Sequence, residues 1–377
     1  MEVVYFVVSA SRPSTTPDFL LSRATGSVRT QGSVKTYVNV DKAIDDIEAQ
    51  RVEMVVGALP FDLDKPAALT VPESIIREEG ALEPHSFFRN QTLTSEVSAV
   101  DPDPHEHLRR VEAAIGTITA SRLEKVVLAR AVDIEFDGPV DPMLVAARLI
   151  DMSNHRNGFA ADLTPAGYDG AMLVGASPEV LVKKQGNIVS AFPLAGSAAR
   201  SANTEEDHAA GQHLINSAKD LREHAFVVDH LVEILRPLCS EFHAPSRPQL
   251  VQTNEMWHLG TPITGTLKKP STTALELATL CHPTPAICGT PTAAAKSLIC
   301  TAETDRGFYS GAVGWCDSNG DGEYVVAIRC AEVAGDGLTA RAWAGGGIVE
   351  DSDPEAELEE TTAKLQTIVR AMGIQNL

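Results

Sequence analysis

Short apolar segments separated by turn-forming residues place the strongest constraint on the fold of this 377-residue chain. They are KVVLARAVDIEF (125–136), GAMLVGA (170–176), EVLVKKQGNIVSAFPL (179–194), FYSGAVGWCDSNGDGEYVVAIRCAEV (308–333) and GLTARAWAGGGIV (337–349). Runs of β-branched residues bounded by Gly, Pro, Asn and Asp predict strands, and the close succession of the last two segments predicts antiparallel hairpins. DSNGDG (317–322) opens like a calcium loop, but its twelfth position is Ile328 instead of Glu, so we interpret it as a hairpin turn.

Three helices are predicted around these strands: one beginning near Pro104, one over residues 205–235, and one from Pro354 to about Met372. Proline suits the first helical position, and Asp353 is a good N-cap for the last helix. We expect the HEH side chains (105–107) to be solvated, because their spacing does not match a helical metal site. No linker interrupts the chain. We therefore predict one α+β domain over residues 1–377, with 1–95 as its N-terminal part and 100–377 as its motif-bearing core.

Charge and cysteine content exclude several classes of protein. The formal net charge of -20 argues against a nucleic-acid or anionic-membrane partner, and it requires local cations or a metal wherever an anion binds. The six cysteines include no C-x-x-C pair, which argues against a zinc site or a disulfide framework and favours the cytoplasm. The N-terminal MEVVYFVVSA lacks a basic segment, so we predict a strand there rather than a signal peptide.

Acidic side chains recur on two of the predicted helices. Asp220 and Glu223 lie three residues apart, as do Glu357 and Glu360, and Lys364 follows the second pair. The first pair is predicted to lie beside an apolar stripe formed by Leu214, Ala218, Leu221, Ala225, Val228, Val232 and Leu235. Carboxylates from two helices that meet at one point would suit Mg²⁺, which prefers oxygen ligands. Spacing alone leaves open the alternative of two solvated acidic faces.

Seven motifs follow one another along the chain: EKVVLAR, GASPEVLVKK, FPLAGSAAR, HPTPAICGTP, DRGFYSGAVGW, GEYVVAIRCAEV and AGGGIVEDSDPEAELEETTAKL. Together they resemble the chorismate-utilising enzyme family, which includes isochorismate, salicylate, anthranilate and aminodeoxychorismate synthases. The resemblance covers about residue 100 to the C terminus, with a weaker similarity in GALPFD (57–62). It implies a fold like that of anthranilate synthase component I, an α/β domain of stacked antiparallel sheets flanked by helices, and Mg²⁺-dependent chemistry on chorismate.

The resemblance also implies roles for individual residues. Lys125 corresponds to the general base that activates water, and Glu179 corresponds to the general acid that protonates the departing hydroxyl. For these roles Lys125 must be neutral and Glu179 must be protonated. The residues that correspond to the metal site are Glu223 and Glu360 as direct ligands, with Asp220 (where Glu is commoner) and Glu357 nearby or acting through water. The residues that correspond to the substrate site are Gly196, Ser197, His282, Ile287, Tyr309, Arg329, Gly347 and Lys364.

Within the family, the motifs favour an isochorismate synthase, which adds water at C2 of chorismate and releases the C4 hydroxyl. Ala195 stands where aminodeoxychorismate synthases have a nucleophilic lysine, and HPTPAICG is similar to synthases that supply dihydroxybenzoate siderophores. The first alternative is a salicylate synthase, which also eliminates pyruvate, a step that Ala286 and Ile287 are expected to influence. The second is a non-catalytic metal-binding homologue, which the presence of both Lys125 and Glu179 disfavours.

The resemblance has consequences for partners as well. The chain shows nothing that resembles a glutamine amidotransferase, so we expect no obligatory partner of that kind, and we expect a monomer. Chorismate is the expected small-molecule partner. Siderophore and menaquinone biosynthesis both remain open as pathways, because both use the same product.

Overall fold

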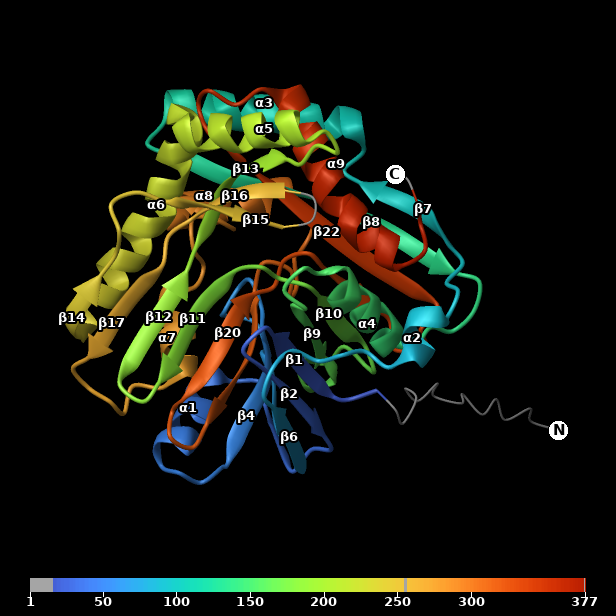
Figure 1. Ribbon diagram of the computed structural model, residues 1–377, viewed down its shortest axis with the longest axis vertical. Helices are drawn as coiled ribbons and strands as arrows, with labels where there is room; N and C mark the ends of the chain where they lie inside the picture. Colours follow the sequence, from blue (N-terminus) through green and yellow to red (C-terminus); the bar gives the residue numbers. More distant parts are fainter. Residues whose placement is uncertain (1–15, 254–255, 376) are drawn as a thin grey trace.

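Two large antiparallel sheets, packed face to face, form the centre of the molecule (Figure 1). The computed structural model describes residues 16–253, 256–375 and 377, so the predicted strand MEVVYFVVSA lies outside the described residues. The larger sheet contains, in spatial order, β18 (Gly289–Thr290), β8 (Lys125–Phe136), β22 (Thr339–Ile348), β21 (Cys330–Val333), β10 (Met172–Gly175), β9 (Gly158–Asp162), β1 (Phe19–Arg23), β2 (Gly26–Gln31) and β6 (Ser74–Glu78), with β7 (Ser95–Asp101) beside β8.

The second sheet contains, in spatial order, β14 (Cys239–His243), β17 (Ile263–Leu267), β12 (Ile188–Phe192), β11 (Val180–Gln185), β20 (Gly322–Val326), β19 (Ala312–Asp317), β4 (Met54–Leu59), β5 (Ala68–Val71) and β3 (Lys35–Tyr37). A small third sheet contains β13 (Leu194–Ala199), β16 (Met256–Gly260) and β15 (Gln249–Gln252). Strands from the first 95 residues therefore occur in both large sheets, which intertwines this part of the chain with the rest.

Helices cover the outer faces of both large sheets. The second sheet is covered by α1 (Val40–Glu48), α6 (Ala218–Leu235) and α7 (Ala274–Cys281), and the larger sheet by α2 (Ser86–Asn90), α4 (Pro142–Met152) and α9 (Pro354–Ala371). The remaining helices are α3 (Pro104–Ala120) and α8 (Thr292–Ala302), which contact β8, and α5 (Thr204–Asn216), which contacts the small sheet. This arrangement confirms the predicted fold of stacked antiparallel sheets flanked by helices. Among the described residues, no helix combines the length and apolar character needed to cross a membrane.

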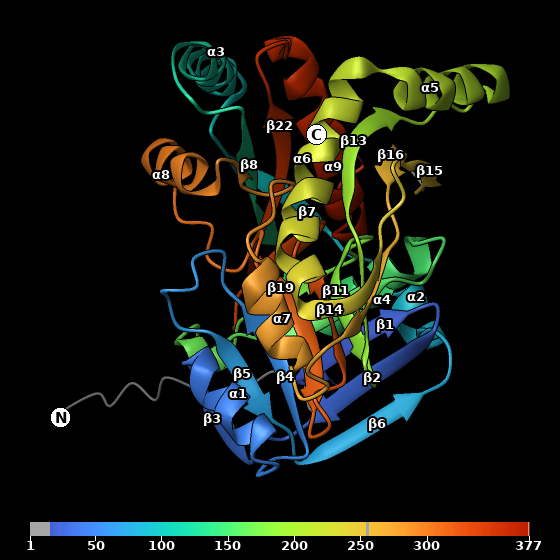
Figure 2. The same ribbon diagram turned by 90° about the vertical axis from the view of Figure 1, so that its left-hand side faces the viewer.

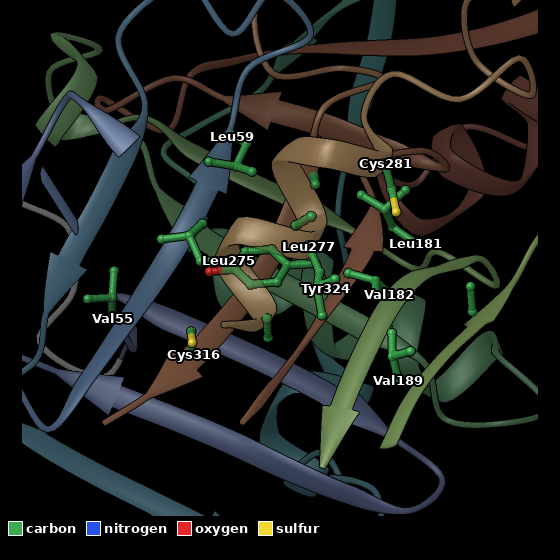
Figure 3. Packing of buried hydrophobic residues seen from close by; sticks show 14 of the residues in the cluster. Val55, Leu59, Leu181, Val182, Val189, Leu275, Leu277, Cys281, Cys316 and Tyr324 are labelled. Atoms are coloured by element: carbon green, nitrogen blue, oxygen red, sulfur yellow. The ribbon is translucent and has the colours of Figure 1, made fainter. Parts of the chain in front are cut away.

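The alternation of side chains along a strand explains how both faces of each sheet are buried. In β8, Ala129 and Ala131 point into the layer between the two large sheets, whereas Val132 and Ile134 point to the helices outside. Figure 3 shows the outer layer of the second sheet, where Leu275 and Leu277 of α7 pack beside Tyr324 of β20. Each such leucine contributes about 1.5–3 kcal/mol by leaving water, so these layers supply much of the folding free energy.

Several elements agree closely with the sequence predictions. The segment KVVLARAVDIEF forms β8 with the predicted limits, and the last helix begins at Pro354 with Asp353 as its N-cap. The DSNGDG segment is the predicted hairpin turn, because it joins the antiparallel strands β19 and β20. These elements carry strong local signals in β-branched composition, capping residues and turn residues, and such signals do not depend on tertiary contacts.

The helix predicted over residues 205–235 is instead two helices, α5 and α6. Ser217 interrupts it with an extended backbone, and the Ser217 hydroxyl accepts a hydrogen bond from the Asp220 amide over 3.2 Å. A serine N-cap of this kind starts a new helix, and Figure 2 shows that α6 runs at a steep angle to α5. The break places the first turns of α6, rather than the middle of one long helix, at the candidate site.

The prediction for the HEH segment is wrong for one of its histidines. His107 is buried with 1% of its surface exposed, whereas His105 is exposed. The reason is helical periodicity, because His107 shares one face of α3 with the buried Val111, Ala114 and Ile118.

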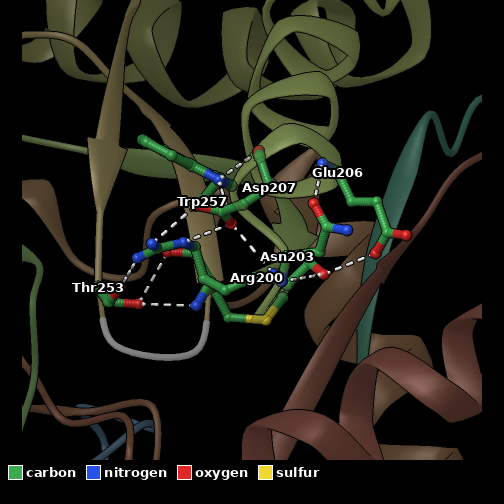
Figure 4. A network of polar contacts seen from close by, with 8 residues as sticks. Arg200, Asn203, Glu206, Asp207, Thr253 and Trp257 are labelled. Carbon is green, nitrogen blue, oxygen red and sulfur yellow. Dashed lines mark hydrogen bonds and ion pairs between the residues drawn. The ribbon is translucent and has the colours of Figure 1, made fainter.

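A polar network fastens α5 to the small sheet (Figure 4). The Arg200 guanidinium donates to both carboxylate oxygens of Asp207, over 2.7 and 2.8 Å, and to the Thr253 carbonyl over 2.9 Å. The Trp257 indole N–H also donates to Asp207, over 3.1 Å. A bidentate arginine–carboxylate pair fixes orientation as well as distance. The network therefore holds β13 and β16, two strands that line the candidate site.

Candidate active site

A cavity of about 80 Å³ lies where β13, β16, β22 and the first turns of α6 and α9 meet. The predicted site residues that line it are Glu179, Gly196, Ser197, Glu223, Ile287, Tyr309, Arg329, Gly347, Glu360 and Lys364. A larger cavity of about 450 Å³ shares Pro178 and Arg329 with it. The smaller cavity is the candidate active site, because the predicted acidic and basic side chains line it, whereas the lining of the larger cavity is mainly apolar.

Lys125, the first residue of β8, lies just behind the wall of this cavity. Its side chain has no exposed surface, and its Nζ donates to Oε1 of Glu223 over 2.9 Å. Gly347 lines the cavity beside this pair, and a Cβ added there would lie 2.5 Å from Glu223 Oε1 and 2.9 Å from Lys125 Cε. A side chain at this position would force the lysine or the carboxylate to shift. Gly347 thus leaves room for both groups beside the cavity wall.

Glu179 is the second buried ionisable group of the site, with 3% of its surface exposed. Burial raises the pKa of Glu179 to about 8, although the Leu194 amide and the charges of Lys125 and Lys364 act in the opposite direction. A carboxyl with this pKa is mostly protonated at neutral pH. Glu179 can therefore donate a proton into the cavity.

Two cationic side chains, Arg329 and Lys364, line the cavity and suit an anionic ligand. Arg329 is 8% exposed and adopts a left-handed backbone with φ of 51°, and Lys364 donates to the Gly345 carbonyl over 2.9 Å. Tyr309 stacks on Trp343 with ring centroids 5.7 Å apart, which adds a flat apolar wall. The cavity thus combines anion-binding groups with a surface for a ring.

The acids predicted to hold a metal come together at the starts of α6 and α9. Glu357 is 2% exposed, and its Oε1 accepts hydrogen bonds from Ser352 Oγ over 2.7 Å and from Lys219 Nζ over 3.1 Å. Ser197 Oγ donates to Glu360 Oε1 over 2.9 Å, and Lys364 forms an ion pair with the same carboxylate. Burial, and then the neighbouring Glu360 charge, raise the pKa of Glu357. In the described part of the chain, no group of three or more His, Cys, Asp or Glu side chains is arranged to hold a metal ion. Three of these acids are instead paired with lysines.

The predicted position of the first acid pair needs correction. Asp220 and Glu223 were expected beside the apolar stripe, but they lie on the half-buried inner face of α6. The buried face continues through His224, Val227, Leu231 and Leu235, whereas Ala218 and Ala225 are exposed. The stripe is displaced because the inner face of α6 is polar at its start and becomes apolar only later. Gly196 accommodates this start, since a Cβ there would lie 3.1 Å from the Asp220 Cβ.

A family model described as a chorismate binding enzyme matches residues 68–373 of the chain. The chain belongs to this family. MenF of Mycobacterium tuberculosis is 45% identical over 363 residues, which are 95% of this chain and 97% of MenF. The isochorismate synthase DhbC of Bacillus subtilis is 43% identical over 329 residues, 86% of this chain and 82% of DhbC. The crystal structure of DhbC from Bacillus anthracis matches with a TM-score of 0.88 at 38% identity, over 97% of this chain and 98% of DhbC.

Not every residue assigned by resemblance lines the cavity of this chorismate-binding enzyme. His282 is buried outside the lining, with its Nε2 2.9 Å from the Phe61 carbonyl oxygen. Ile287 does line it, and its carbonyl accepts a hydrogen bond from Arg306 over 2.8 Å.

Two titratable residues of the site were missed by the sequence analysis, as was the aromatic Trp343. His258 lines the cavity, and its buried Nε2 has no hydrogen-bond partner among the described residues. Burial holds the pKa of His258 well below the usual value, so the ring is neutral. Lys219 pairs with Glu357, next in the chain to the predicted Asp220. His258 has no local signal, because a single histidine in a strand occurs in most proteins. For Lys219 the available signal was its position next to Asp220, a predicted metal ligand.

Proposed function

We propose that the chain is an isochorismate synthase, an isomerase that converts chorismate to isochorismate. The observation that carries the proposal is the pairing, at one small cavity, of a protonated buried carboxyl on Glu179 with a buried lysine, Lys125. Relatives named for this reaction, such as DhbC at 43% identity, support it. The resemblance to MenF and to DhbC supports both menaquinone and siderophore pathways as destinations of the product.

Two residues of the site transfer protons in the proposed reaction, and others bind the substrate. In its neutral form Lys125 accepts a proton from water as the water oxygen bonds to C2 of chorismate, and Glu179 donates a proton to the C4 hydroxyl as its C–O bond breaks. The ring double bonds shift between these positions, so atoms and charge balance without an external oxidant or reductant. Arg329 and Lys364 bind the substrate carboxylates through charge-assisted hydrogen bonds, and the Tyr309–Trp343 stack lies along the ring.

We also propose Mg²⁺ as the cofactor. The donor set fits, because the candidate ligands Glu223 and Glu360, with Asp220 and Glu357 beside them, offer only oxygen atoms. Glu357 Oε2 supports the proposal, since it is a buried carboxylate oxygen with no hydrogen-bond partner in the described residues. When bound, the ion would neutralise a substrate carboxylate in a protein whose own net charge is -20.

The chemistry implies few partners. Water is the nucleophile, so no ammonia-supplying amidotransferase is needed, and we propose that the enzyme works as a monomer in the cytoplasm. The described cysteines are all free thiols, which agrees with a reducing compartment.

The test is to incubate the purified protein with chorismate, with and without Mg²⁺, and to separate the products by reverse-phase chromatography. Isochorismate formed in equilibrium with chorismate, and only with Mg²⁺, is the expected result. Salicylate with pyruvate would instead identify the alternative salicylate synthase. Chorismate that remains unchanged at millimolar Mg²⁺ would overturn the proposed function.

A further inference from the structure

Lys219 contacts one carboxylate of the proposed metal site, that of Glu357, and interacts with the charges of the other three. It is the second residue of α6 and immediately precedes Asp220, and its Nζ is 3.1 Å from Glu357 Oε1 on α9. Burial acts to lower the Lys219 pKa, but the charges of Glu357, Glu223 and Asp220 raise it overall. Glu360 also interacts with the Lys219 charge. The Lys219 ammonium therefore offsets part of the negative charge of the carboxylates that Mg²⁺ is proposed to bind.

Each of the other two lysines of the site forms an ion pair with one acid, and each is less exposed to solvent than Lys219. Lys125 is fully shielded from solvent beside Glu223, and the Lys364 side chain, beside Glu360, is 16% exposed. The Lys219 side chain is 33% exposed, so its flexible stem can carry the ammonium into water. Ser352 donates to Glu357 independently, over 2.7 Å, and would keep that carboxylate oriented after Lys219 has left.

We propose that the Lys219 ammonium and a divalent cation compete for these carboxylates, so that Lys219 sets the affinity of the site for the cation. The inference rests on the proposed metal site but not on the proposed reaction. Binding of a divalent cation beside Lys219 brings positive charges together, and release of Lys219 from Glu357 relieves the repulsion. Lys219 thereby acts as a built-in counterion that maintains the acidic cluster and is exchanged for the cation.

The first experiment measures binding of Mn²⁺ alone, without chorismate, by EPR titration of the wild-type protein and of Lys219→Met, Lys219→Arg and Lys42→Met. We expect Lys219→Met to bind Mn²⁺ about tenfold more tightly, since a like charge within about 4–6 Å commonly changes proton affinity by that factor or more. Lys219→Arg retains the charge, and Lys42→Met removes a charge from an exposed residue of α1, so both should stay within about threefold of wild type. Unchanged or weaker binding by Lys219→Met would overturn the proposal.

A second experiment uses only the wild-type chain and does not depend on the folding of a variant. Lysine acetylation is followed by mass spectrometry with and without Mg²⁺. Competition predicts at least about threefold faster modification of Lys219 in the presence of Mg²⁺, because the displaced ammonium becomes exposed and loses its carboxylate partners. A rate that is unchanged or slower would contradict the exchange. Isochorismate formation is measured separately, so a protein that shows the exchange but leaves chorismate unchanged would refute the reaction and not the competition.

Discussion

Lys125 donates a hydrogen bond from Nζ to Oε1 of Glu223 over 2.9 Å, and the lysine side chain has no contact with solvent. The pair joins the first residue of β8, in the larger sheet, to α6, which covers the other sheet. A buried charge needs a partner of this kind, because an unpaired ammonium in the interior is strongly destabilising. One contact thus connects the two halves of the fold at the site where the proposed base must act.

We expect Lys125→Met to lower kcat by at least about 10²-fold, because general-base catalysis contributes about 10²–10⁴-fold. The same change leaves Glu223 without its partner and should reduce the free energy of unfolding by about 3 kcal/mol. Chorismate turnover and urea unfolding measure the two effects. The control is Lys296→Met, which breaks a more exposed pair with Asp62 and should cost less than about 1 kcal/mol without affecting turnover. Turnover by Lys125→Met at the wild-type rate would exclude Lys125 from the reaction.

The raised pKa of Glu179 predicts a pH dependence of activity. The carboxyl donates its proton only while protonated, and its pKa is about 8, so its contribution to kcat/KM should fall about tenfold per pH unit above that value. The test compares kcat/KM over pH 6–10 between wild type and Glu179→Gln, because every other titrating group acts on both proteins. Two profiles of the same shape would exclude Glu179 as the acid. Glu179→Gln cannot donate the proton and should lose at least about 10²-fold in kcat at pH values where the wild-type carboxyl is protonated.

The same pKa predicts a cost in stability. The folded chain holds a proton on Glu179 up to about pH 8, whereas an unfolded glutamate releases it near its usual pKa of 4.5. Since the folded state binds more protons between these values, this residue lowers the free energy of unfolding as pH rises from about 4.5 to about 8. We therefore expect Glu179→Gln to raise the Tm relative to wild type more at pH 8 than at pH 5. Equal effects at the two pH values in differential scanning calorimetry would show that burial of this carboxyl carries no such penalty.

Local sequence signals predicted β8, the β19–β20 hairpin and the start of α9, because each depends on neighbouring residues alone. The register of α6 depends on its surroundings instead. Apolar residues also occur on protein surfaces, and a stripe through Ala218 and Ala225 appeared apolar although both are exposed. The true inner face of α6 begins with Asp220 and Glu223, so a search for apolar residues at helical spacing cannot find it.

In the candidate site, too, some residues were predicted from local sequence signals and others depend on tertiary contacts. Motifs located Glu179, Gly347 and Lys364 at the cavity, because their chemistry needs particular residue types in particular contexts. His258 and Lys219 reach the site only through the pairing of β16 with β13 and the approach of α6 to α9. Those are contacts between segments far apart in the sequence, and residue spacing along the chain does not predict them.

Gly347 offers the sharpest test of the site geometry. A methyl group in Gly347→Ala would lie 2.5 Å from Glu223 Oε1 and 2.9 Å from Lys125 Cε, so these two side chains would have to shift and the geometry of their pair would change. We expect a loss of about 1–3 kcal/mol in the free energy of unfolding from this overpacking. We also expect kcat to fall at least about 10²-fold, since small misplacements of catalytic groups have effects of that size.

The matched control is Gly116→Ala, at an exposed position of α3 where an added Cβ meets no atom within 4 Å. It should leave turnover unchanged and stabilise the chain by up to about 1 kcal/mol, because alanine favours the helix. Chorismate turnover and urea unfolding of the two variants under the same conditions make the comparison. If Gly347→Ala behaves like Gly116→Ala, the close approach of Lys125 and Glu223 to the backbone is not required, and the glycine triplet needs another explanation.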